Sequence, residues 1–413
     1  MINIKRHSID LILLMITMVL LIYSTEPVIQ GDSRRYLSYN LSDPPLIPWF
    51  VKITLYLFGS LKAIVILQTL AIYFGVVKFT KTISKYFDIK ILTKLFIALF
   101  LFIPIINFYR HILSESLSYA FFLFFASYII KLIFNFKIKN VICVTLFAVI
   151  LLNLRSQFIF IYLIIFIIYL SIFIINKKKT FSFLLISFIS IFLIHNTLTK
   201  VNHYILQNFF KEKVMYKNQE KNGPFNYIFI DAIYISTIED AELLEDDKIK
   251  NITIQIFKKM HNEKSLQEYY NGRGHFGLSF ATIRDYSNLS LNELALNINV
   301  SIYDLKKEIS LTLLSKNFFK YLKFIFKKFY DSTWLFVIVP AILFIPALIN
   351  FIKYRTQFSL VIVFFSSFAL ANHSIVYLFG RVQPRYLIYS DFALLVIIFL
   401  VFIHAFKKST NKF

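Results

Sequence analysis

The sequence predicts an all-α polytopic membrane protein with about ten transmembrane helices and one mostly helical extracytoplasmic insert. Hydrophobic residues make up 58% of the 413 residues, and the mean hydropathy is +0.66. Charged residues make up only 16%, against roughly a quarter in soluble domains. The apolar residues also gather in runs that approach the roughly 20 helical residues needed to cross a hydrocarbon core.

Ten apolar runs are candidate spans. They lie at 9–25, 60–77, 91–107, 116–134, 140–154, 157–176, 180–198, 333–351, 357–373 and 386–406. We expect the first run to be a span and not a cleaved signal, because no small-residue cleavage site follows it. The predicted organisation is helices 1–7 in 1–198 with a first outer loop at 26–59, a soluble insert at 199–332, and helices 8–10 with a cytoplasmic tail in 333–413.

The net charge of +22 reports orientation. With both termini placed in the cytoplasm, the inner segments hold 17 basic residues and one acid, Asp88. This follows the positive-inside rule, so the charge does not require nucleic-acid binding. The abundance of Ile, Phe, Lys and Asn is typical of an AT-rich genome, and we expect a bacterial plasma membrane.

The arginines follow a different pattern from the lysines. There are 35 Lys and only 10 Arg, and only Arg6 and Arg355 fall on the inner side. Arg can grip a phosphate at two points, which Lys cannot imitate. Arginines gathered at the outer face therefore favour a phosphate-bearing lipid headgroup as ligand. The competing explanation is that they anchor helix ends by snorkelling.

Two acids stand out beside predicted spans, where acids are costly and suggest function. Asp32 lies between a glycine and two arginines in the first outer loop, where it could accept a proton from a substrate. Glu115 opens the fourth span behind Ser114. An acid in a first turn complements the helix dipole, and this role is compatible with a catalytic one.

The order of these features resembles the GT-C superfamily of integral-membrane glycosyltransferases, including the protein mannosyltransferases and the aminoarabinose transferase of lipid A. The matching segments, over about 1–200 and 333–400, are Gly31-Asp32-Ser33-Arg34-Arg35-Tyr36, Pro44-Pro45-Leu46-Ile47-Pro48 before an amphipathic segment at 50–58, Leu113-Ser114-Glu115-Ser116-Leu117, and Arg385-Tyr386-Leu387. The large insert at 199–332 departs from relatives that carry their soluble part at the C-terminus.

The resemblance implies transfer of a sugar from a polyprenyl-phosphate donor to an extracytoplasmic lipid or glycan acceptor. Asp32 would be the general base, with Glu115 as a second catalytic acid, and Tyr36 and Tyr386 would line the substrate. The donor phosphate would be held by Arg34, Arg35, Arg110, His111, Arg155, Arg381 and Arg385. An O-antigen-type polysaccharide polymerase is the alternative, and a lipid-linked glycan flippase is a weaker one.

The insert adds one candidate segment. Asn271 to Phe280 is rich in glycine and carries Arg273 and His275, which suits either a substrate loop or an ordinary turn. The acidic run at 239–247 suits a solvated helix face. The sequence has no His-Glu-x-x-His motif, no cysteine pair and no P-loop, so we expect no metal and no cofactor.

Overall fold

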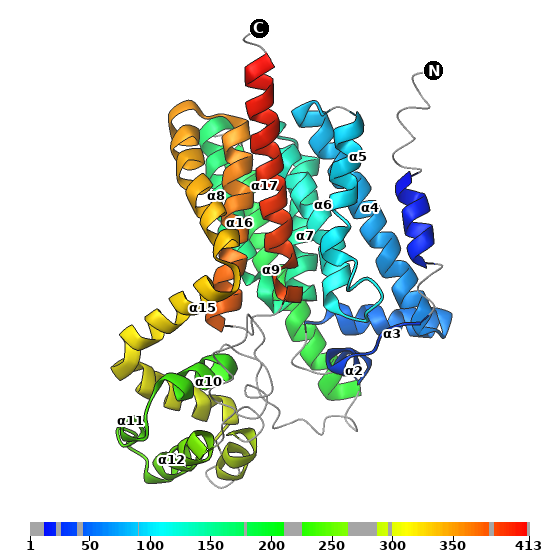
Figure 1. Cartoon of the computed structure of the whole chain (residues 1–413). Helices are drawn as coiled ribbons and strands as arrows, with labels where there is room; N and C mark the ends of the chain where they lie inside the picture. The colour runs from blue at the N-terminus through cyan, green and yellow to red at the C-terminus, as the bar shows by residue number, and fades with distance from the viewer. Residues whose placement is uncertain are drawn as a thin grey trace. The chain divides into compact units, whose positions relative to one another are not determined.

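The computed structural model describes residues 12–21, 26–38, 44–89, 91–176, 180–209, 225–262, 287–295, 300–379 and 384–410 (Figure 1). Within these ranges the regular elements are helices, and one isolated β-bridge pairs two segments that lie outside the helices. The chain forms two compact units. The first comprises 1–210, 338–372 and 388–413, and the second comprises 211–337 and 373–387. The predicted all-helical class is confirmed over the described ranges.

The first unit is a bundle of long helices that run side by side (Figure 1). Its elements are Ile12–Leu21, α2 (Gly31–Ser38), α3 (Leu46–Phe58), α4 (Leu61–Phe87), α5 (Ile91–Phe100), η1 (Ile103–Ile105), α6 (Ser114–Phe134), α7 (Ile138–Leu154), η2 (Ser156–Phe160), α8 (Ile161–Asn176), α9 (Phe181–Phe209), the last part of α15 (Ile302–Tyr354), and most of α16 (Gln357–Phe379) and α17 (Pro384–Thr410).

Within the described ranges, seven helices are long and apolar enough to cross a membrane, which supports a membrane protein. They are Leu61–Phe87, Ser114–Phe134, Ser156–Ile175, Phe181–Asn202, Val337–Tyr354, Gln357–Leu378 and Tyr386–Ala405. The other three predicted spans coincide with shorter apolar helices at Ile12–Leu21, Thr93–Ile105 and Ile138–Leu154. Ten crossings therefore remain a prediction.

The first outer loop contains two helices. The sequence predicted only an amphipathic segment at 50–58, but α3 begins at Leu46 because Pro48 falls in its first turn, where a missing N–H costs nothing. The helix ends at Gly59, whose φ of 61° is left-handed and whose N–H donates to the Leu55 carbonyl. The side chain of Ser60 then caps α4 by accepting from the Lys62 N–H.

Phenylalanine fills the centre of the bundle. Phe122 of α6 stacks on Phe368 of α16 with ring centroids 4.2 Å apart. Phe392 of α17 makes edge contacts with Phe79 and Phe122 at 5.1 and 5.2 Å. Such geometries are the preferred ones for aromatic pairs. Much of the unusual Phe content therefore serves packing between helices.

Helices α4 and α6 approach each other closely at Gly75. A Cβ added at Gly75 would lie 2.9 Å from the Ala120 carbonyl oxygen and 3.3 Å from the Leu123 side chain. The absence of a side chain at Gly75 thus lets the two helices meet.

We expect Gly75→Leu to lower the free energy of unfolding by about 1–3 kcal/mol, because an overpacked core must shift backbone or adopt strained rotamers. The measurement is the thermal unfolding midpoint of the detergent-solubilised full chain. Phe74→Leu is the control, since Phe74 is exposed and adjacent. Equal midpoints for the two variants would contradict the close approach.

The two ends of the bundle differ in chemistry. At one end, the Gln357 amide donates to the Phe134 carbonyl, and Tyr86 stacks on Phe134 at 4.7 Å. Near this end, Lys78 and Lys131 hold their ammonium groups 4.8 and 4.7 Å from the centre of the Tyr128 ring. These are segments that the charge pattern assigned to the cytoplasm. The other end carries the acids of α2 and α6.

The second unit has its own apolar core. Its helices are α10 (Phe225–Ile235), α11 (Ile238–Ala241), α12 (Asp247–Asn262), 287–295 and the first part of α15 (Ile302–Tyr354). The core gathers buried side chains from each of them, including Phe229, Ala241, Phe257, Leu291 and Leu313. Helix α9 continues to Phe209, and the second unit begins at 211, whereas the predicted insert at 199–332 stays a prediction. Helix α15 continues from Ile302 into the predicted eighth span without a break.

Candidate functional site

The segment that precedes α2 pairs with the segment that precedes α6. The Val28 N–H donates to the Arg110 carbonyl at 3.1 Å, and the Ile112 N–H donates to the Val28 carbonyl at 3.3 Å. This is the parallel bridge between Val28 and His111. The Gln30 amide also lies 2.9 Å from His111 Nδ1. Residues about 80 positions apart in sequence are therefore fixed beside each other.

Helix α2 sets the directions of the first-loop side chains. Residues three and four positions apart share a helix face, so Arg35 and Tyr36 lie on the side of Asp32 and Arg34 points elsewhere. Asp32 and Arg35 form an ion pair at 3.7 Å, with their side chains 30% and 38% exposed. Ser33 is buried and accepts from the Gln30 N–H at 3.0 Å. Asp32 is thus held at a boundary between solvent and the bundle.

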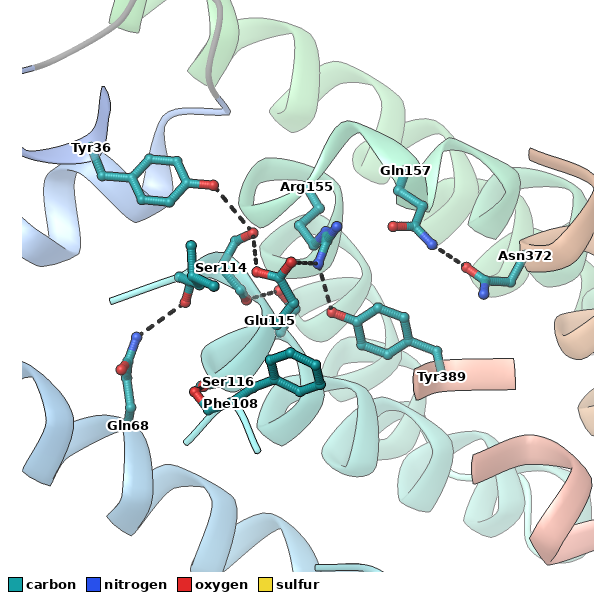
Figure 2. A network of polar contacts seen from close by, with 12 residues as sticks. Tyr36, Gln68, Phe108, Ser114, Glu115, Ser116, Arg155, Gln157, Asn372 and Tyr389 are labelled. Atoms are coloured by element: carbon teal, nitrogen blue, oxygen red, sulfur yellow. Dashed lines mark hydrogen bonds and ion pairs between the residues drawn. The ribbon is translucent and has the colours of Figure 1, made fainter. Parts of the chain in front are cut away.

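A chain of polar contacts runs from α2 into the bundle (Figure 2). The Tyr36 hydroxyl donates to Ser114 Oγ at 3.4 Å, and Ser114 Oγ donates to Glu115 Oε2 at 3.3 Å. Tyr36, Ser114 and Glu115 are all buried. The chain couples the position of the first-loop helix to the first turn of α6.

The centre of the site is a buried ion pair. Arg155 Nη1 lies 3.2 Å from Glu115 Oε1 and also donates to the Tyr389 hydroxyl at 3.4 Å. Glu115 is 1% exposed and Arg155 is 8% exposed. Arg155 follows the end of α7, and Tyr389 comes from the second turn of α17. Figure 2 shows the guanidinium group between the carboxylate and the phenol. The ion pair therefore joins three helices that are distant in sequence.

Further polar side chains surround this centre. The Gln157 amide donates to Asn372 Oδ1 at 2.5 Å (Figure 2). The Asn372 amide donates in turn to Ser390 Oγ at 2.5 Å. The Gln68 amide donates to the Leu113 carbonyl at 3.2 Å, directly before α6. Within an apolar bundle such groups are costly unless they are bonded to one another. These hydrogen-bonded side chains form a polar region at the end of the bundle that carries Asp32.

The predicted phosphate-binding residues fall into different environments. Arg34 and Arg110 are exposed, and no ion pair joins them to another described residue. His111 is half-buried against Gln30. Arg35 and Arg155 are engaged by Asp32 and Glu115, as described above. Of the predicted phosphate-binding arginines whose side chains are described, Arg34 and Arg110 are thus the best placed to meet a phosphate from solvent.

The remaining predicted residues belong to the second unit or lie outside the description. Arg385 lies in the first turn of α17, and its side chain lies outside the described residues. Tyr386 packs against Val376, Tyr377 and Leu387 in the second unit. Arg273, His275 and Arg381 lie outside the described residues.

Sequence reasoning missed several members of the polar region, namely Tyr389, Gln157, Asn372, Ser390 and Gln68. The available signal was the presence of amide side chains in or beside otherwise apolar runs, which invites a functional or structural explanation. Tyr389 carried no such signal, because tyrosine is common near the ends of membrane spans.

No cluster of three or more His, Cys, Asp or Glu side chains that could hold a metal is found over the described ranges. The arrangement instead offers the partly exposed carboxylate of Asp32, the exposed guanidinium groups of Arg34 and Arg110, and the buried ion pair of Glu115 and Arg155.

The described chain is thus a helical membrane protein with a polar region built around a buried Glu–Arg pair at one end of its bundle. No family model, curated protein or solved structure matches it.

Proposed function

We propose that this protein is a membrane glycosyltransferase of the GT-C type. It moves a sugar from a polyprenyl-phosphate donor to an extracytoplasmic lipid or glycan. In this proposal the protein spans a bacterial plasma membrane with both termini in the cytoplasm, and the polar region faces outside. The reaction uses no cofactor.

The observation that carries the proposal is the attachment of α2 to the opening of α6. The Val28–His111 bridge and the contact between Tyr36 and Ser114 hold the first-loop acid beside the second acidic motif. These are two of the four segments that carry the resemblance to the GT-C superfamily. An arrangement in which they lay apart would have argued against a shared site.

The proposed step is a direct displacement at the sugar. The Asp32 carboxylate accepts the proton of the acceptor hydroxyl while the acceptor oxygen forms a bond to the anomeric carbon. The bond from that carbon to the phosphate oxygen breaks, and polyprenyl phosphate leaves with the electron pair. General-base assistance and charge stabilisation of the leaving group are the two contributions that this step needs.

The described side chains divide these roles. Arg34 and Arg110 are exposed, so their guanidinium groups can meet the leaving phosphate at two points each. Glu115 and Arg155 are buried against each other, so we assign them as positioning residues that hold the opening of α6 against α7 and α17. This assignment departs from the sequence-based expectation that Arg155 holds the donor phosphate.

The test uses the leaving group as the probe, because it does not require the sugar to be known. Polyprenyl phosphate is added to the detergent-solubilised full chain, and the thermal unfolding midpoint is measured. Binding to the folded state alone stabilises by RT ln(1 + [L]/Kd), about 2.7 kcal/mol at a hundredfold excess over Kd. We expect stabilisation by polyprenyl phosphate and none by the uncharged polyprenol.

Two comparisons make the test specific. Arg110→Lys should weaken the binding of polyprenyl phosphate through loss of the two-point grip, whereas Arg355→Lys, from the predicted inner side, should not. A lack of stabilisation by polyprenyl phosphate would contradict the donor class. Much tighter binding of polyprenyl pyrophosphate would favour the polymerase that the sequence left as the alternative.

A further inference from the structure

The first part of helix α15 carries two parallel strips on its exposed side. Lys316, Lys320, Lys323 and Lys327 follow one another at intervals of four, three and four residues, which places them in one row along the helix. All four are exposed. Beside this lysine row lies an aromatic strip, formed by Phe319 and Phe326, which are seven residues apart on one face and are 84% and 70% exposed.

The side of the same helix that lies away from the aromatic strip is fixed in the core of the second unit. Leu313, Phe324 and Ile325 are buried there. The helix is therefore packed against the core on one side, and the exposed Phe side chains lie on another side. Their own side of the helix is directed away from the core.

A polar contact fixes the rotation of the helix. The Asn317 amide donates to Asp240 Oδ2 at 2.9 Å and to Ser236 Oγ at 3.3 Å. Burial opposes ionisation of Asp240, but hydrogen bonds from Thr237 and Asn317, together with the positive charge of Lys320 at the edge of the lysine row, outweigh it and lower the pKa of Asp240. The aspartate therefore remains charged and keeps Asn317 turned inward, which keeps the two strips turned outward.

A row of lysines beside a strip of phenylalanines is the pattern of a helix that meets a membrane surface. Aromatic side chains enter the boundary between headgroups and acyl chains, while lysine stems lie along it and bring their ammonium groups to the phosphates. Each lysine near an anionic lipid surface contributes roughly a fivefold factor in association. Lys327 also lies ten residues before the span Val337–Tyr354, about 15 Å along the helix.

We propose that the lysine row and aromatic strip of α15 dock on the anionic headgroups of the membrane that the chain spans. This contact holds the second unit against the lipid surface. It is independent of sugar transfer, because none of these residues belongs to the proposed site.

The experiment reports contact between this face and lipid in the intact protein. Cys143, the only native cysteine, is replaced by Ser, and Ser315→Cys is labelled with an environment-sensitive fluorophore. Ser315 is exposed within the aromatic strip, so every Phe and Lys of the face remains. The labelled full chain is placed in nanodiscs of phosphatidylcholine, with or without phosphatidylglycerol, that contain a quencher-bearing lipid. Leu289→Cys, 71% exposed on the same unit, is the control position.

We expect several-fold stronger quenching at position 315 than at 289, and a further increase when phosphatidylglycerol is present. Lys→Glu changes at all four positions of the lysine row should remove that increase, as should high salt. These lysines are exposed, and size-exclusion chromatography checks that the variant remains folded. Equal quenching at 315 and 289, or quenching at 315 that ignores both phosphatidylglycerol and the lysine row, would overturn the proposal.

Discussion

Asp32→Asn is expected to abolish sugar transfer from a polyprenyl-phosphate donor while the protein stays folded. Asparagine has the shape of aspartate but cannot accept the proton of the acceptor hydroxyl, and general-base assistance typically contributes about 10²–10⁴-fold in rate. The measurement is transfer of labelled sugar in membranes that contain the acceptor. The same variant should still be stabilised by polyprenyl phosphate, because the leaving group is held by other residues.

The structure indicates that Asp32→Asn removes the proposed base without displacing α2. The ion pair between Asp32 and Arg35 is partly exposed, and such pairs contribute about 0–1 kcal/mol. Its loss should leave α2 in place, since the Val28–His111 bridge and the Tyr36–Ser114 contact do not involve Asp32. A drop in activity would therefore report chemistry and not a displaced helix.

Asp88→Asn is the matched control. Asp88 caps the end of α4 with a φ of 49°, a left-handed conformation that asparagine adopts well. It belongs to the segment that the charge pattern places in the cytoplasm. Activity should survive this change. Full activity in Asp32→Asn would end the assignment of Asp32 as the base, and loss of activity in both variants would point to a general effect on folding.

The sequence was sufficient to predict the helical membrane class, because hydropathy and charge sorting act over whole segments. The seven long apolar helices each coincide with a predicted span. It could not define helix ends, because lysines and short polar stretches do not stop a helix. Helix α4 continues through Lys78 and Lys81 to Phe87, and α15 continues through the predicted boundary near 333.

The sequence could predict which types of residue form the candidate site, but not which of these side chains contact one another. Hydropathy says that an acid beside a span is costly, which singled out Glu115. Which cation would meet it depends on how α6, α7 and α17 pack. Arg155 lies 40 residues from Glu115 and Tyr389 more than 200 residues further on, so no local pattern connects them. Packing pairs Arg155 with the buried Glu115, and the binding of the donor phosphate by Arg155 stays a prediction.

Removing one member of the buried pair is expected to destabilise the protein strongly. Arg155→Met leaves the Glu115 carboxylate buried without its cation, a change that typically costs about 3–5 kcal/mol in a protein interior. Glu115→Gln should also destabilise the protein, because the Arg155 guanidinium group is then buried without its counter-charge. The measurement is the unfolding of the detergent-solubilised full chain by heat or denaturant.

The double variant separates a structural pair from a ligand site. If the main role of Glu115 and Arg155 is to neutralise each other, the double variant Glu115→Gln with Arg155→Met should be more stable than either single variant. The double-mutant cycle would then show that the two destabilising effects are far from additive. Arg35→Met is the control, because its partly exposed pair with Asp32 should be worth at most about 1 kcal/mol. The contrary outcome is a stable Arg155→Met protein that no longer binds polyprenyl phosphate. In that case Arg155 must leave Glu115 to meet the donor, and the buried pair would be the resting state of a phosphate-binding residue.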